Sequence, residues 1–185
     1  EGWPTRFLVR LLIVGGLVIA TPMKHSAHDV PPDVRVHAFI APEGDRLRVL
    51  IRVPLDAMRD FIFPQRGPGY LDLEASESML RDAIMVWVGD EFDVYEDGRK
   101  LTDQRLETVR VSLPSDRSFE DYSRALNHIT GPPLDNSTDI AWQQAMLDAL
   151  FEYDIRSDRA QFSVNPTLGR LGIRTSTVLR FVLPE

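Results

Sequence analysis

Histidines are the only metal-binding side chains of borderline softness in this chain, which has four of them and no cysteine. The missing thiols exclude thiolate zinc sites, thiol nucleophiles and iron–sulfur clusters. We expect His37 on a strand and His128 near the end of a short helix, and neither has a second histidine at a ligand spacing. Cleavage of the chain after Ala27 would leave the α-amino group and imidazole of His28 free to chelate copper or nickel. A metal site would need His37 or His128 beside His28, and the alternative is an ordinary mature terminus without a cofactor.

The common hydrolase signatures are absent from the sequence. It contains no Gly-x-Ser-x-Gly, no His-Glu-x-x-His, and no Ser-x-x-Lys with a partner motif. The carboxylate pairs Asp90/Glu91 and Glu96/Asp97 lie at expected turns beside basic residues, which favours solvated loops over an acid–base pair. The chain is therefore predicted not to be an enzyme. A cleft that placed a nucleophile beside His128 would instead indicate a hydrolase.

The charge of the chain argues against nucleic acid as a partner. The net charge is −7, and residues 1–27 carry +2 from Arg6, Arg10 and Lys24 against Glu1, which leaves −9 on the remainder. An acidic surface repels phosphate backbones, and no basic stripe with interleaved aromatics is present. No small-molecule substrate is indicated either.

Alternating apolar residues predict a sheet. Residues 34–40 and 47–53 alternate with a period of two around a turn at 43–45, which predicts an N-terminal hairpin. Arg46, Arg48 and Arg52 share one side of the second strand, which indicates a solvated sheet face. A run at 84–88 would also suit a strand, and 142–150 taken alone would suit a helix. Further strands are expected at 92–95, 100–101, 109–113, 147–155 and 173–183, and helices at 76–88 and 118–129.

These elements predict a mainly β fold of the β-rich α+β class. The expected architecture is an antiparallel β-sandwich, of which an Ig-like arrangement is one form, with two short helical insertions. Residues 28–185 have the length of one ordinary domain and need neither metal nor disulfide to hold a core.

Residues 1–27 have the parts of an export signal. Arg6 and Arg10 precede the uncharged apolar run 11–20 (LLIVGGLVIA), and a short polar stretch follows it. An uncleaved N-terminal anchor is the alternative, but the uncharged stretch 11–23 is shorter than the roughly 20 residues that span a bilayer. Cleavage after Ala27 or Ala20 stays open. Residues 28–185 are therefore expected outside the cytoplasm, on the periplasmic side of the inner membrane.

Several short sequence segments together resemble a known family, the extracytoplasmic N-terminal region of bacterial membrane proteins of the HupE/UreJ type. The resemblance spans nearly all of residues 28–185. It is carried by residues 28–31 (HDVP), 42–47 (PEGDRL), 66–73 (RGPGYLDL), 95–99 (YEDGR), 111–119 (VSLPSDRSF), 155–159 (IRSDR) and 178–181 (VLRF).

The resemblance implies a longer parent protein in which transmembrane helices follow this region. Members of that group are associated with nickel or cobalt uptake through a His- and Asp-rich membrane helix, which nothing in residues 28–185 matches. The expected function is a non-catalytic, periplasm-facing domain whose partner is its own C-terminal transmembrane segment or another membrane protein. The alternative is a free periplasmic copper- or nickel-binding module that uses a mature N-terminal His28.

Overall fold

The computed structural model describes residues 33–183. The predicted signal peptide or anchor over residues 1–27 and the proposed metal ligand His28 lie outside the described residues. Among residues 33–183, no helix combines the length and the hydrophobicity that crossing a membrane requires.

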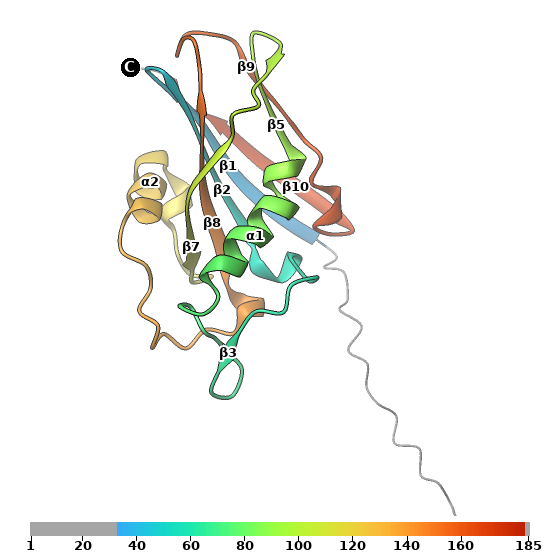
Figure 1. The fold of residues 1–185 in the computed structure, drawn as a ribbon, viewed down its shortest axis with the longest axis vertical. Helices are drawn as coiled ribbons and strands as arrows, with labels where there is room; N and C mark the ends of the chain where they lie inside the picture. The colour runs from blue at the N-terminus through green and yellow to red at the C-terminus, as the bar shows by residue number, and fades with distance from the viewer. Residues whose placement is uncertain (1–32, 184–185) are drawn as a thin grey trace, which may run out of the picture.

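A five-stranded sheet in the order β10-β1-β2-β8-β7 forms the centre of the fold (Figure 1). All neighbouring strands are antiparallel except β1 and β10, which run parallel. The sheet is therefore mixed rather than fully antiparallel as expected, because the last strand returns beside the first in the same direction. The strands are β1 (Asp33–Glu43), β2 (Arg46–Pro54), β7 (Arg105–Ser112), β8 (Met146–Asp154) and β10 (Arg174–Phe181).

The predicted N-terminal hairpin is confirmed as β1 and β2. Their register pairs Ile40 with Val49 and Ala38 with Ile51, all buried on one face of the sheet. Gly44 in the connecting turn has a φ of +64°, a conformation that glycine adopts without a Cβ clash. Local alternation and a glycine turn thus suffice to form this pair.

Smaller strands complete the β structure. A three-stranded sheet has the order β6-β5-β9, and β3 pairs with β4. The expected Asp97-Gly98 turn joins β5 to β6, and both of its residues have positive φ, as a type I′ hairpin turn requires. These strands are β3 (Gln65–Arg66), β4 (Tyr70–Leu71), β5 (Phe92–Glu96), β6 (Arg99–Lys100) and β9 (Phe162–Pro166).

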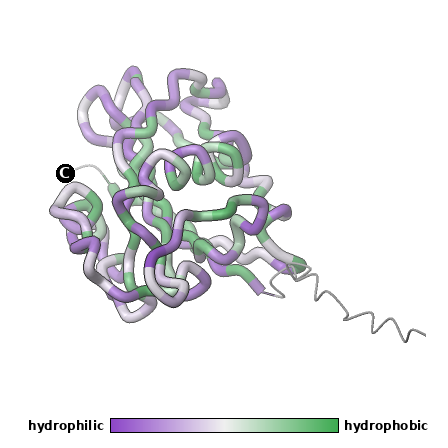
Figure 2. Tube along the Cα trace, turned by 60° about the horizontal axis from the view of Figure 1, so that its bottom comes forward, coloured by the Kyte–Doolittle hydropathy of each residue, from purple (hydrophilic) through white to green (hydrophobic). Residues whose placement is uncertain are grey.

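Helix α1 (Glu77–Trp87) covers one face of the central sheet and lies in front of it in Figure 1. It buries Leu80, Ala83, Ile84 and Trp87, so the strand alternative for residues 84–88 is wrong. Apolar residues of β5 and β9 join the same core, and Figure 2 shows hydrophobic residues gathered along the central strands. The short 3₁₀ helices are η1 (Leu55–Ala57), η2 (Gly89–Glu91), η3 (Ser118–Glu120), η4 (Trp142–Gln144) and η5 (Leu168–Arg170).

Helix α2 (Tyr122–Thr130) and η3 cover part of the opposite face, where they form a second, smaller core. Phe39, Leu50 and Leu150 of the sheet pack there against Ala125 and Ile129 of α2. The prediction that this arginine-bearing face is solvated is therefore wrong at its centre. Residues 146–154 form a strand, so the helical alternative for 142–150 is wrong too.

The expectation of a mainly β fold with two helices is confirmed. A sandwich or Ig-like arrangement is not established, because helices pack on both faces of the larger sheet and the second sheet has only short strands.

Candidate functional site

A buried arginine lies at the centre of the face beneath η3 and α2. Arg52 of β2 is 5% exposed and pairs in register with Asp148 of β8, which is 0% exposed. Its Nε and Nη2 donate to the two carboxylate oxygens of Asp148, each at 2.6 Å. This bidentate ion pair is a strong arrangement of a guanidinium and a carboxylate, and it compensates the charge of a carboxylate that water does not reach.

The loop before η3 contributes a second carboxylate. Nη2 of Arg52 lies 2.8 Å from Oδ1 of Asp116, and Nη1 donates to the Asp116 carbonyl oxygen at 3.1 Å. Partial burial alone would raise the pKa of Asp116, but hydrogen bonds from Ser118 and Arg52 outweigh that effect and lower the pKa to about 2. The guanidinium also stacks 4.3 Å from the ring centre of Phe119. Arg52 thereby ties the loop and η3 to the sheet.

The same cluster brings together a serine, a histidine and a carboxylate. Ser112 Oγ lies 2.7 Å from His128 Nε2 and donates to Asp148 Oδ2 at 2.5 Å. His128 Nε2 is 3.4 Å from that oxygen, and its Nδ1 is 3.7 Å from Asp116 Oδ2. The hydrogen bond with Asp148 raises the pKa of His128 more than burial lowers it.

This grouping does not have the arrangement of a serine hydrolase. In such enzymes the serine hydroxyl gives its proton to the histidine, and a carboxylate holds the opposite ring nitrogen. Here the hydroxyl of Ser112 donates to Asp148, so His128 Nε2 must act as the donor toward Ser112. The Ser112 side chain is also 0% exposed, which keeps a substrate away from it. Helix α2 and η3 are therefore held on the sheet by a polar network that is buried at its centre and partly exposed at Asp116 and His128. Its members are Arg52, Ser112, Asp116, Ser118, His128 and Asp148.

A cavity of about 320 Å³ opens beside this network. His37 of β1 lines it, as the expected strand position of that residue allows. Burial lowers the pKa of His37, and the nearby charges of Arg180, Arg35 and Arg52 lower it further. The arginines around His37 thus disfavour both its protonation and the binding of a cation beside it.

The predicted metal ligands do not form a cluster in the described part of the chain. His37 and His128 both belong to the α2-bearing face, but no group of three or more His, Cys, Asp or Glu side chains within residues 33–183 is arranged to hold a metal ion. His28 lies outside the described residues, so a copper or nickel site that includes it stays a prediction.

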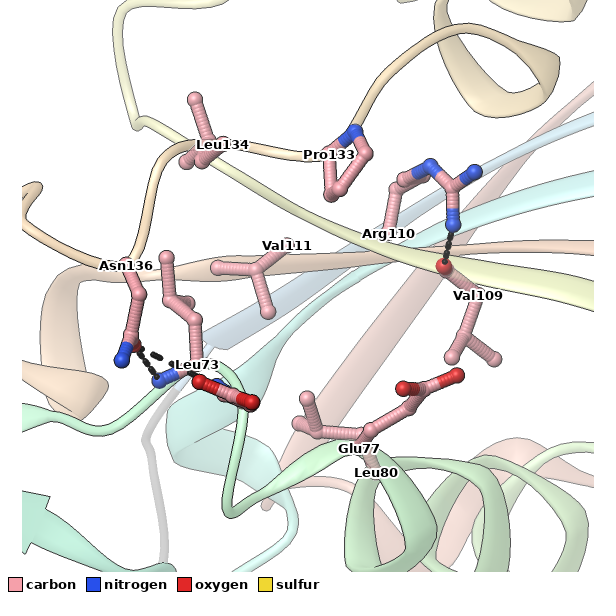
Figure 3. Close-up of a pocket in the computed structure, with 10 residues that line it drawn as sticks. Leu73, Glu77, Leu80, Val109, Arg110, Val111, Pro133, Leu134 and Asn136 are labelled. Carbon is pink, nitrogen blue, oxygen red and sulfur yellow. Dashed lines mark hydrogen bonds between the residues drawn. The ribbon is translucent and has the colours of Figure 1, made fainter.

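A second cavity, of about 340 Å³, lies between α1, the edge strand β7 and the loop after α2 (Figure 3). Val109 and Val111 of β7 face Leu80 of α1 across it. Asn136 Oδ1 accepts hydrogen bonds from the backbone N–H groups of Leu73, at 2.9 Å, and Glu74, at 3.3 Å, which holds the loop in place. Its walls are mainly apolar, and its lining residues include no serine, threonine or lysine.

Reasoning from the sequence missed Arg52, Ser112 and Asp148 as parts of one cluster. One local signal was present, since Arg52 lies in an otherwise apolar run (VLIRV) and Asp148 in another (MLDALF). A lone charge inside a buried strand requires a partner, because an unpaired buried charge is strongly unfavourable. The sequence does not show, however, that these two strands are neighbours.

No family model and no curated protein matches the chain. Any functional conclusion therefore depends on the geometry of the molecule and on the residue patterns described above.

Proposed function

We propose that residues 28–185 form a non-catalytic, periplasm-facing domain of a HupE/UreJ-like membrane protein. The domain acts by contact with its own C-terminal transmembrane segment or with another membrane protein, and a link to nickel or cobalt uptake would run through that membrane part. It carries no reaction of its own.

One observation carries the non-catalytic part of this proposal, namely the burial of Ser112 and Asp148 and their contacts with each other and with the partly exposed His128. The Ser112 hydroxyl is inaccessible and its proton is directed to Asp148. Asp148 in turn is neutralised by Arg52. A nucleophile needs an adjacent free base and access to substrate, and this serine has neither.

The remaining parts of the proposal are supported by residue patterns. Residues 1–27 contain a basic, an apolar and a polar segment in the order of an export signal, which favours export. The short sequence segments of residues 28–185 named above favour the HupE/UreJ-like assignment. We also propose that the sheets form a β-sandwich, of which an Ig-like arrangement is one form. The sandwich is supported by Phe92 and Val94 of β5, which share one core with Phe151 and Tyr153 of the larger sheet.

Export can be tested by placing charges in the apolar run. Gly15→Arg combined with Leu17→Arg should leave the chain in the cytosol, because the run would no longer enter the membrane. Gly15→Ala with Leu17→Ala is the matched control and should still be exported. Fractionation that finds the unaltered chain in the cytosol would contradict the proposal.

The link to a membrane part is tested by reading the gene beyond codon 185. A following block of hydrophobic helices is expected, and a stop codon without such a block would argue against the HupE/UreJ-like assignment.

The absence of catalysis is tested by labelling with a fluorophosphonate, which reacts with activated serines. We expect no labelling of the folded protein. Labelling that disappears in Ser112→Ala but persists in Ser118→Ala would show an activated nucleophile and would overturn the non-catalytic assignment.

A further inference from the structure

Helix α2 and η3 cover only part of the second face of the central sheet. Beyond them, the face continues over β1 and β10, where His37 and Arg180 border the 320 Å³ cavity. We call this cavity the β1–β10 pocket. Its lining includes Arg35, His37, Pro54, Arg117, Met146 and Arg180. The pocket has a volume at the lower end of those that hold small ligands.

The β1–β10 pocket has excess positive charge. Both acidic residues that line it are already paired, Asp116 with Arg52 at 2.8 Å and Glu120 with Arg117 at 2.6 Å. Within residues 33–183, no carboxylate lies at ion-pair distance from Arg35 or Arg180. Among residues 33–183, Arg35 and Arg180 therefore form no ion pair. After the hydrogen bond from Arg117, the charge of Arg180 nevertheless contributes to lowering the pKa of Glu120. This excess positive charge lies in a protein whose net charge is −7.

The guanidinium of Arg180 is held in position before any ligand arrives. Nη1 of Arg180 donates to the carbonyl oxygen of Phe119 at 2.9 Å, and its guanidinium lies 5.4 Å from the ring centre of Phe39. The Nδ1 atom of His37 is buried and has no hydrogen-bond partner within the described part of the chain. Because water does not reach Nδ1, a ligand in the pocket would contact the His37 ring without a hydrogen bond to this atom.

We propose that the β1–β10 pocket binds a small organic anion that carries a carboxylate or a phosphate monoester. Arg35 and Arg180 form ion pairs with its oxyanion, which lies against the His37 ring. The carbon part of the ligand contacts Pro54 and Met146. Arginine suits this role because its planar guanidinium matches the geometry of both oxyanions.

The site does not depend on the proposed membrane part, since every residue that forms it belongs to residues 33–183. It also differs from the predicted metal site, because three arginines around His37 repel a metal cation and attract an anion.

The test is an NMR titration of the purified chain that follows the His37 ring, assigned by its loss in His37→Gln. The added compounds are benzoate, phenyl phosphate and inorganic phosphate, at constant ionic strength with chloride as the balancing anion. We expect roughly millimolar binding of benzoate, phenyl phosphate or both, and a rise in the pKa of His37 of about one unit when the anion is bound. Which compound binds more tightly distinguishes a carboxylate from a phosphate ligand.

Variants locate the site. Arg180→Gln and Arg35→Gln should each weaken binding about tenfold or more, because each removes one charge-assisted contact. Arg159→Gln is the matched control, an exposed arginine outside the pocket, and should bind as the unaltered protein does. Circular dichroism of each variant establishes that it is folded, and the two arginines give independent tests if one variant is not.

Three results would overturn the proposal. The first is an unchanged His37 signal with all three compounds. The second is equal weakening of binding in Arg159→Gln and in the pocket variants. The third is inorganic phosphate binding as tightly as phenyl phosphate with no binding of benzoate, which would exclude an organic ligand in contact with Pro54 and Met146.

Discussion

Replacing Arg52 by methionine should strongly destabilise the protein, because it leaves the buried carboxylate of Asp148 without its main partner. Asp148 is 0% exposed, accepts both 2.6 Å bonds from Arg52, and would keep only Ser112 and His128. Breaking a buried ion pair on one side costs about 3–5 kcal/mol. The lost stacking on Phe119 adds about 1 kcal/mol, so we expect a loss of about 4–6 kcal/mol near neutral pH.

The loss should depend on pH, because His128 is the one other titratable cation of the network. In Arg52→Met the charge that lowers the His128 pKa is gone, so protonated His128 would partly replace Arg52 as the partner of Asp148. Urea unfolding, measured at about pH 5.5 and about pH 8, should therefore show a smaller difference from the unaltered protein at the lower pH.

Arg46→Met is the matched control for this prediction. Arg46 lies on the same strand and the same face, is 54% exposed at its side chain, and pairs with Glu152, which keeps Arg48 at 3.0 Å. Its replacement should cost about 1 kcal/mol or less. Adding Asp148→Leu to Arg52→Met should restore part of the lost stability, since no isolated charge remains. The reasoning is refuted if both arginine replacements cost the same, or if Asp148→Leu restores nothing.

Three further predictions concern single groups. The pKa of His128 is raised above its unfolded value of 6.5, so the protonated ring stabilises the fold fully below about pH 6.5, and this stabilisation is lost as the pH rises through the folded pKa. Urea unfolding of His128→Gln should therefore show a free energy of unfolding that changes less over this pH range. Burial would raise the pKa of Glu96, but hydrogen bonds from Arg156 and Ser157 lower it to about 2. The ionised carboxylate therefore stabilises the fold above about pH 4.5, and this stabilisation is lost as the pH falls toward 2. In an acid titration, the stability of Glu96→Gln should lack this decrease. Gly98→Ala should lower the unfolding free energy by about 1 kcal/mol, because φ at this position is +77°, and thermal unfolding measures the change.

Much of the fold followed from local patterns. The β1–β2 hairpin and the Asp97-Gly98 turn were predicted correctly, because alternation and turn residues act between neighbours in the chain. Strand β9 was missed because Ser163, Asn165 and Pro166 break its apolar character, and it forms by pairing with β5. The parallel pairing of β10 with β1 was missed as well, since no local pattern records which distant strands meet.

The candidate site was predictable only in part. His37 on a strand and His128 near the end of a helix lie where the sequence indicated. Their surroundings did not follow from the sequence, because Arg52 and Asp148 are 96 residues apart and meet only through the pairing of β2 with β8.

The amino-acid sequence by itself determined the thiol-free chemistry, the acidic charge, the turns and the two-sided character of the strands, since composition and period need no distant contacts. Tertiary packing decided which parts of the second face of the central sheet are covered by helices and shielded from water. Helix α2 and η3 cover its centre, and this burial makes Arg52 a structural residue, whereas Arg35 and Arg180 on the same face stay exposed beyond them. The physical reason is that the burial of a charge, and with it the need for a partner, depends on neighbours that only folding brings together.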